Sequence, residues 1–155
     1  MSKPAQPTIW IDGDGIPSAC KDVIFKASLR TKVPVIMVAN RYQQVPKLRF
    51  IKFQQVHGGL DVADDYIAEH CRAGDLVVTS DIPLAARVVG SGALVLRFRG
   101  ELLDEENVQQ RLAVRDRMDA LRGAGIATGG PPAYGPKDKQ RFANALDRWL
   151  ARKKL

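Results

Sequence analysis

The chain has 155 residues, of which 45% are hydrophobic and 26% charged, so it is long enough for one domain with a single hydrophobic core. Apolar runs such as residues 33–39 are too short to span a bilayer, and residues 1–7 lack a signal-peptide pattern, so we expect no membrane association and a loose N-terminal lead. Two cysteines are too few for a disulfide framework, which favours a cytoplasmic protein.

The net charge of +7 is concentrated at one end of the chain. Residues 1–110 contain 13 Lys and Arg against 13 Asp and Glu, whereas residues 111–155 contain 11 against 4. A basic flank beside a neutral body suits a polyanionic partner such as RNA or DNA. A basic surface that serves only solubility explains the same charge equally well.

The first elements alternate strand and helix. Residues 8–12 form an apolar run rich in β-formers and predict the first strand. Pro17 marks the start of a helix, because Cys20, Ile24 and Ala27 then fall on one face.

The middle of the chain continues this alternation. Residues 33–39 are nearly continuous apolar and β-branched, which is typical of a strand buried on both faces, and residues 48–56 predict a weaker edge strand. Residues 60–71 predict a helix with an acidic first turn, followed by Gly74. Residues 76–79 predict the fourth strand.

A further helix from Pro83 to about Gly90 and a fifth strand at residues 93–96 complete the pattern. Strand and helix alternate at the spacing of right-handed crossovers, which predicts an α/β fold: a three-layer sandwich around a mostly parallel central sheet. We expect residues 1–155 to form one domain.

Beyond Asp104 the pattern is helical, so we expect extra C-terminal helices. Two apolar stripes mark them. The glycine- and proline-rich residues 123–136 separate the stripes, and a loop of that length favours a functional role. The stripes are Val114, Met118 and Leu121, then Phe142, Leu146 and Trp149.

Carboxylates occur where a parallel sheet presents its carboxyl edge, which is where sites form in open α/β sheets. The candidates are Asp12 and Asp14 after the first strand, Asp61, Asp64 and Asp65 at the start of the mid-chain helix, and Asp81 after the fourth strand.

Like charges at i, i+3 and i+4 repel each other, so a compensating cation is expected. One or two Mg²⁺ or Mn²⁺ ions fit, because hard cations prefer carboxylate oxygen, and such ions activate water for phosphodiester hydrolysis. We therefore treat all six aspartates as metal candidates, and Asp12, Asp61, Asp65 and Asp81 also as catalytic candidates.

Each aspartate taken alone also has a structural explanation. An aspartate at the start of a helix caps the first turn and complements the helix dipole, which covers Asp61 and Asp81. The metal interpretation depends on the set meeting at one edge of the sheet.

Several blocks of sequence, in order along nearly the whole chain, resemble the bacterial YaiI/YqxD family. They are residues 9–17 (Ile-Trp-Ile-Asp-Gly-Asp-Gly-Ile-Pro) with Lys21-Asp22, residues 59–67, 74–85 and 99–101, then residues 129–131 and 141–149. The opening motif of the family usually reads Asp-Ala-Asp-Ala-Cys-Pro; here Gly13, Gly15 and Ile16 replace the alanines and the cysteine, and both aspartates remain.

The resemblance implies a PIN-like fold. PIN-type nucleases carry metal-binding acids after the first strand, on a mid-chain helix and in a Thr-x-Asp motif after the fourth strand. Asp12, the group Asp61, Asp64 and Asp65, and Thr79-Ser80-Asp81 match those positions, which gives Thr79 and Ser80 supporting roles. Asn40, at the end of the second strand, is placed to reach the same site or to shape a turn.

A basic segment with interleaved aromatics is the candidate for holding nucleic acid by charge and stacking. Its cations are Arg41, Lys47, Arg49 and Lys52. Aromatic residues at alternating positions are more often the core side of a strand, and we prefer that interpretation for Phe50 or Phe53.

The sequence thus predicts a divalent-metal-dependent nuclease, with RNA favoured over DNA because PIN-like proteins more often act on RNA. Two alternatives remain. One is a non-catalytic nucleic-acid-binding or regulatory module. The other, less favoured, is a haloacid-dehalogenase-like phosphatase with Asp12 as nucleophile and Asp14 as general acid, although the pair Asp64-Asp65 comes too early in the chain for that family.

Overall fold

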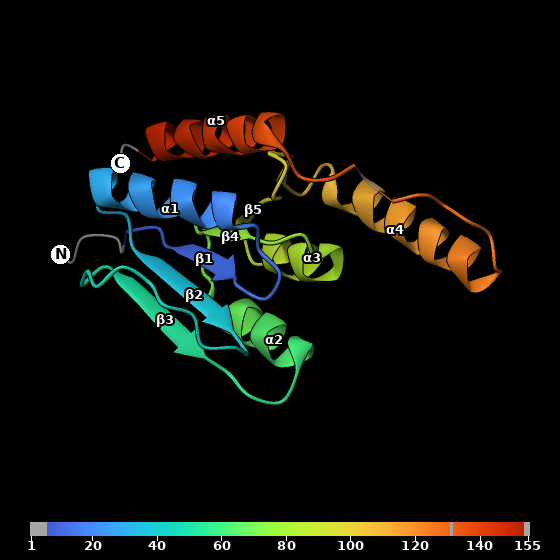
Figure 1. Ribbon diagram of the computed structural model, residues 1–155, viewed down its shortest axis with the longest axis horizontal. Helices are drawn as coiled ribbons and strands as arrows, with labels where there is room; N and C mark the ends of the chain where they lie inside the picture. The colour runs from blue at the N-terminus through green and yellow to red at the C-terminus, as the bar shows by residue number, and fades with distance from the viewer. Residues whose placement is uncertain (1–5, 131, 154–155) are drawn as a thin grey trace.

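The computed structural model describes residues 6–130 and 132–153, with the side chain of Leu60 left out (Figure 1). Most of the predicted N-terminal lead, residues 1–5, and Pro131 of the predicted loop lie outside the described residues. The elements are β1 (Ile9–Asp12), α1 (Ser18–Thr31), β2 (Val35–Ala39), β3 (Ile51–Gln55), α2 (Leu60–His70), β4 (Leu76–Val78), α3 (Ile82–Gly90), β5 (Leu94–Leu96), β6 (Leu102–Leu103), α4 (Val108–Gly123) and α5 (Pro136–Arg152).

The six strands form one sheet in the order β3-β2-β1-β4-β5-β6. The first five are parallel, and β6 pairs antiparallel with β5, which confirms the predicted α/β class with a mostly parallel sheet. The predicted edge strand is β3, at the outer position beside β2. The sequence did not predict β6, because a strand of two residues is too short to show an alternating pattern of apolar side chains.

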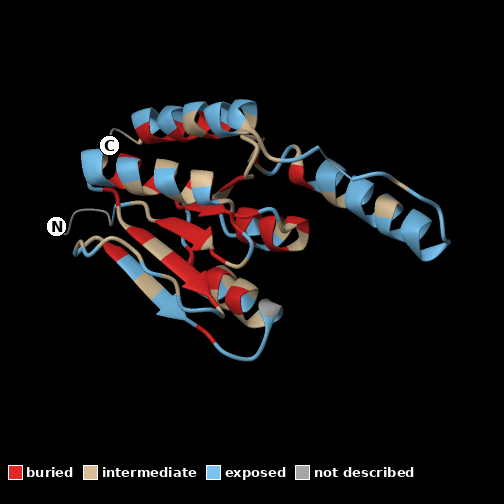
Figure 2. Cartoon of the chain, in the orientation of Figure 1, coloured by how far each residue is buried: buried red, intermediate tan, exposed pale blue. Residues whose placement is uncertain are grey.

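Helices cover both faces of the sheet, so the predicted three layers are present (Figure 1). Alternate residues of each strand serve the two faces. In β1, Ile9 and Ile11 pack with α1 and α5, whereas Trp10 packs with α2 and α3. The central strands are buried on both sides, and the exposed residues lie on the outer helices and on β3 (Figure 2). Within the described residues, no helix is long and apolar enough to cross a membrane.

The two C-terminal helices differ in how far they are buried. The predicted stripe of α5 is buried against α1 and the sheet, and it consists of Phe142, Leu146 and Trp149. The stripe of α4 is not part of the core: Val114 and Leu121 are each 40% exposed. Only the start of α4, at Val108 and Leu112, packs against the core beside α3.

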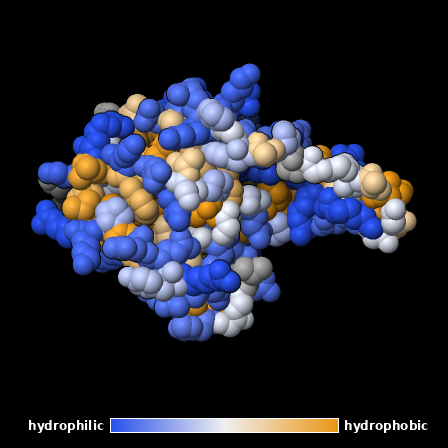
Figure 3. All heavy atoms as spheres, viewed as in Figure 1, coloured by the Kyte–Doolittle hydropathy of each residue, from blue (hydrophilic) through white to orange (hydrophobic). Residues whose placement is uncertain are grey.

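The rest of α4 projects from the body as an arm (Figures 1 and 2). On the face seen in Figure 3 the arm is mostly hydrophilic, with apolar side chains near its tip. Leu121 and Ile126, the latter 51% exposed, belong to that end of the arm. A helix without a buried face gains little from tertiary packing, so residues along the arm remain available for contacts outside the domain.

A tight turn after β5 joins the sheet to the C-terminal region. The backbone N–H of Arg97 donates to the carbonyl of Glu101 at 2.8 Å, and Gly100 lies between them with φ +97°. Tyr134 donates to the carbonyl of Phe98 at 2.9 Å, so this turn also holds the segment that leads into α5. A Cβ on Gly100 would lie 2.7 Å from the carbonyl carbon of Arg141 in α5.

Gly100→Ala is therefore expected to destabilise the protein by about 2–4 kcal/mol, from an unfavourable φ and a backbone clash. Urea unfolding followed by circular dichroism measures the change. Gly90→Ala at the end of α3 is the control, because a Cβ there meets nothing within 4 Å and should be close to neutral. Equal stability of the two variants would contradict the packing described for Gly100.

Candidate functional site

Three carboxylates meet at the carboxyl edge of the sheet, and we call Asp12, Asp64 and Asp81 the acidic cluster. Asp12 ends β1, and Asp81 follows the neighbouring strand β4 and caps α3. Asp64 comes from α2. The chain leaves β1 for α1 on one face and leaves β4 for α3 on the other, so the edge opens at this topological switch point.

Thr79 connects the two strand ends. Its buried hydroxyl donates to Asp12 Oδ2 at 2.8 Å and accepts from the backbone N–H of Asp81 at 3.0 Å. Asp81 Oδ1 accepts from the N–H of Leu84 at 2.9 Å, so the predicted cap role is present. The cap engages one carboxylate oxygen, and Asp81 can therefore cap α3 and contribute to the cluster at the same time.

Burial and mutual repulsion disfavour the charged forms of two members of the cluster. Burial raises the pKa of Asp12 to about 6, the Thr79 hydrogen bond opposes this, and the charges of Asp81 and Asp14 add to the increase. Burial also raises the pKa of Asp64 to about 7, with further increases from Asp81, Asp12 and Asp61. The repulsion shows that carboxylates from β1, α2 and the start of α3 lie close together.

Two of the predicted aspartates have other partners. Both oxygens of Asp14 accept from the backbone N–H of Asn40, at 3.2 and 3.0 Å, and the Asn40 amide Nδ2 donates to Asp14 Oδ2 at 3.0 Å. Asp65 pairs with Arg87 of α3 at 2.7 Å. Asp61 is exposed in the first turn of α2 and acts on the cluster through its effect on Asp64.

Asn40 reaches the site as a positioning residue. Its Nδ2 donates to the carbonyl of Gly59 at 2.8 Å, and its Oδ1 accepts from the N–H of Gly59 at 3.1 Å. Gly59 is the residue immediately before α2 and has φ 110°. Asn40 thus ties the end of β2 to the start of the helix that carries Asp64.

The donor atoms of the cluster are all carboxylate oxygens, which fits Mg²⁺ or Mn²⁺. Their arrangement is not that of a preformed metal cage. In the part of the chain that the structure describes, no group of three or more His, Cys, Asp or Glu side chains is gathered closely enough to hold an ion.

The four predicted nucleic-acid-binding cations are not gathered in one place. Arg41 lies at the carboxyl edge, where it lines a cavity of about 520 Å³ with Asp14, Gly15, Asn40 and Gly59. Arg49 lies near the opposite edge, because Phe50 beside it bonds to the start of β2. The cause is the parallel pairing of β2 and β3, which makes residues 40–50 cross from one edge to the other. Lys47 and Lys52 are exposed on this crossing and on β3.

The aromatic side chains of this segment have mainly packing roles. Phe50 and Phe53 pack against the core on the α1 and α5 side, as the structural interpretation predicts. Tyr42 is 72% exposed and contacts Phe53 edge-on, with 5.5 Å between the ring centroids.

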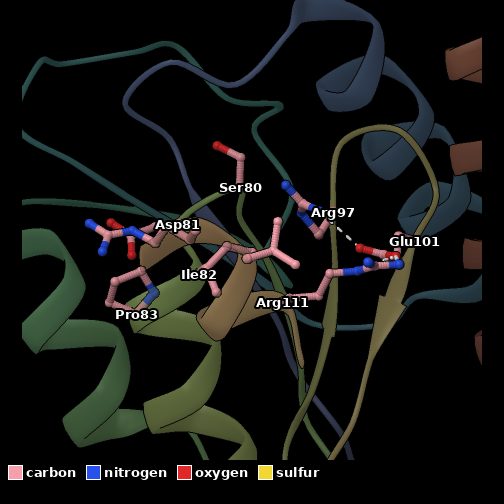
Figure 4. Close-up of a pocket in the computed structure, with 9 residues that line it drawn as sticks. Ser80, Asp81, Ile82, Pro83, Arg97, Glu101 and Arg111 are labelled. Carbon is pink, nitrogen blue, oxygen red and sulfur yellow. Dashed lines mark hydrogen bonds and ion pairs between the residues drawn. The ribbon is translucent and has the colours of Figure 1, made fainter. Parts of the chain in front are cut away.

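A second cavity, which the sequence did not predict, lies at the same edge (Figure 4). Its volume is about 640 Å³, and it adjoins the acidic cluster through Asp81 and the exposed Ser80. Three cations line it, one from the turn after β5 and two from α4, and only the Arg-Gly-Glu block at residues 99–101 pointed toward this region. The remaining lining residues are Ile82, Pro83, Arg97, Glu101, Arg111, Val114 and Arg115.

Fold and site together define a doubly wound α/β domain with an acidic cluster at its switch point. Residues 10–152 match the family model described as "Uncharacterized BCR, YaiI/YqxD family", so the chain belongs to the YaiI/YqxD family. No solved structure is significantly similar to it, and the PIN-like comparison therefore stays a prediction.

The relatives have nearly the same length as this chain. A UPF0178 protein of Xanthomonas campestris pv. campestris (strain 8004) is 51% identical over 155 residues, which cover 98% of this chain and 97% of the relative. A UPF0178 protein of Cronobacter sakazakii is 50% identical over 146 residues, covering 94% and 97%. One from Pseudoalteromonas atlantica is 51% identical over 145 residues, covering 94% and 99%.

Asp64→Asn is expected to stabilise the protein at pH 8 in EDTA. The folded pKa of Asp64, about 7, lies above the ordinary value of 3.8 for an aspartate, so the folded state binds more protons and stability falls as pH rises from about 4 to 7. Removing the charge should raise Tm at pH 8 by about 2–4 °C, after discounting for solvent screening, and have little effect near pH 4.

Thermal unfolding across this pH range measures the effect. Asp116→Asn is the matched control, because Asp116 is exposed on α4 and pairs with Arg115 instead of facing other carboxylates. A fall in Tm for Asp64→Asn at pH 8 would show that its carboxylate is stabilising and not repelled.

Proposed function

We propose that the protein is a divalent-metal-dependent nuclease that hydrolyses phosphodiester bonds at the acidic cluster, with RNA favoured over DNA. One observation supports this above the others. Three carboxylates from three separate elements lie together at the switch point, and burial together with their mutual repulsion raises the pKa of Asp64 to about 7 and that of Asp12 to about 6. Titratable groups whose pKa values are shifted in this way are typical of functional sites.

The repulsion gives the cluster its affinity for a cation. Asp12, Asp64 and Asp81 would hold Mg²⁺ or Mn²⁺, with the exposed Asp61 beside them, whereas Asp14 and Asp65 support the site through Asn40 and Arg87. Because these side chains are not gathered as a preformed cage, binding must draw them together. The bound ion supplies the activation of water and the stabilisation of the leaving oxygen.

The residues of the chain fix the orientation of the ligands. Thr79 holds one oxygen of Asp12, and the N–H of Leu84 holds one oxygen of Asp81. Asn40 fixes the start of α2 and therefore the approach of Asp64. Asp12 and Asp81 thus each have one oxygen held by a defined neighbour and retain the other for a cation.

A non-catalytic nucleic-acid-binding module is the second candidate. It is favoured by the lack of a preformed group of three metal-binding side chains among the described residues. The phosphatase interpretation is weaker, because it needs Asp14 as a proton donor, and both oxygens of Asp14 accept hydrogen bonds from Asn40.

Asp81→Asn separates the nuclease from the binding module. Asparagine caps helices as well as aspartate does, so α3 should remain intact. The wild type should bind Mn²⁺ in a calorimetric titration and cleave RNA in its presence. The variant should bind Mn²⁺ at least roughly tenfold more weakly and lose cleavage.

Asp147→Asn is the control, because Asp147 lies exposed on α5 and pairs with Arg30. It should match the wild type in Mn²⁺ affinity and cleavage. Wild-type protein that neither binds Mn²⁺ nor cleaves any RNA or DNA substrate would overturn the nuclease and leave the binding module. Cleavage retained by Asp81→Asn would remove Asp81 from the mechanism.

A further inference from the structure

The cavity beside Asp81 is built from three segments that are distant in the sequence. The start of α3 provides one wall with Ile82 and Pro83. The turn after β5 provides Arg97 and Glu101, and α4 provides further arginines. Figure 4 shows Arg97, Glu101 and Arg111 opposite Asp81 and Pro83. We call it the arginine cavity.

Its arginines are fixed in place. Arg97 Nη1 donates to Glu101 Oε1 at 2.9 Å, and Arg111 donates through Nε and Nη2 to Glu101 Oε2 at 2.8 and 2.5 Å. Both guanidinium groups are therefore held by one carboxylate. These bonds engage only part of the five N–H donors of each guanidinium group, so both can still bind an anion. Arg115 of α4 also lines the cavity, and its Nη1 pairs with Asp116 and Asp119 at 3.2 Å each.

One donor in this group lacks an acceptor. Arg97 Nε is buried and has no hydrogen-bond partner in the described part of the chain. This N–H is closed off from the cavity, so a ligand there contacts the exposed part of the Arg97 side chain. Phosphate oxygens are the acceptors that arginine binds best through several N–H groups.

The apolar part of the lining adds a second requirement. Ile82, Pro83 and Val114 face the same cavity as the arginines. A ligand that fits both surfaces carries phosphate and a flat or apolar group together, as a nucleotide does. In a duplex the bases are stacked inside and are not available to such a wall, whereas single strands offer them.

Two cavities flank the acidic cluster along the carboxyl edge. Arg41 lines one beyond β2, and the arginine cavity lies beyond β5. The ends of β2 and β5 are separated by three strand spacings, or about 14 Å at the usual distance between neighbouring strands. A strand of several nucleotides can therefore reach from Arg97 in the arginine cavity to Arg41 in the other cavity.

We propose that the protein binds a single-stranded nucleic acid across this edge, with a backbone phosphate in the arginine cavity and the strand continuing past the acidic cluster toward Arg41. The inference rests on the proposed function for the identity of the cluster, and it adds the form of the substrate. The helix α4 then has a role, because it carries Arg111 at its packed start and Arg115 at the base of the arm to the cavity.

The test is binding without catalysis. A fluorescein-labelled oligouridylate of about 15 nucleotides, within the range of known single-strand sites, is titrated with the full-length protein in EDTA and followed by anisotropy. Arg111→Ala should weaken binding about tenfold, the effect of one lost charge-assisted contact. It should also lower the slope of log K against log salt by about 0.7, the value for one phosphate contact on a single strand.

Arg117→Ala is the matched control, since it removes the same charge from the same helix and Arg117 is outside the described lining of the cavity. It should change affinity by less than about twofold. Arg115→Ala is the second variant, should Arg111→Ala perturb Glu101 and the turn. Circular dichroism establishes that each variant is folded.

Equal weakening of binding by Arg111→Ala and Arg117→Ala would contradict a phosphate site in the arginine cavity, because diffuse charge on α4 would then explain binding. If a duplex of the same length binds as tightly as the single strand, the proposed preference for single-stranded nucleic acid is wrong. If uridine monophosphate competes at the same concentration as the oligonucleotide, one nucleotide is enough for binding, and the proposal of an extended strand is wrong.

This experiment is independent of the nuclease activity. The predicted pattern in EDTA together with no Mn²⁺-dependent cleavage would support the strand site and reject the nuclease. Cleavage lost in Asp81→Asn together with equal effects of Arg111→Ala and Arg117→Ala would support the nuclease and reject the strand site.

Discussion

The hydroxyl of Thr79 joins the ends of β1 and β4 in one hydrogen-bonded unit, and the geometry of the acidic cluster depends on it. It donates to Asp12 and accepts from the backbone of Asp81, so it fixes two carboxylates on neighbouring strands in relation to each other. Thr79 is fully buried, which makes this junction part of the core as well as of the site. The strand order places the junction where the chain departs to opposite faces of the sheet.

The position of these carboxylates at the junction lowers the stability of the fold. Burial and like charge together raise the pKa values of Asp12 and Asp64 toward neutrality, so the cluster is a site that the fold holds at some expense of stability. Asn40 and Arg87 reduce the expense by engaging Asp14 and Asp65. Of the six aspartates at this edge, the fold thus leaves four without a cationic or side-chain amide partner among residues 6–130 and 132–153: the three of the acidic cluster and the exposed Asp61.

The arm and the turn after β5 extend the site beyond the sheet. Gly100 packs on α5, Glu101 holds Arg97 and Arg111, and α4 closes one side of the cavity. An arm whose apolar residues are exposed contributes little to the core. The basic excess of the C-terminal third therefore lies partly on a surface beside the acidic cluster.

The local sequence determined the α/β class, most strand and helix positions, and the approach of Asp12 and Asp81 to one edge, because apolar periodicity and parallel strand direction are properties of short segments. Only the tertiary structure decided which aspartates interact. Asp14 turns to Asn40 and Asp65 to Arg87 because β2 and α3 happen to lie beside them. The exposure of α4, the separation of Arg41 from Arg49, and the joining of Arg97 with Arg111 likewise depend on contacts between distant segments. Spacing along the chain does not encode these contacts.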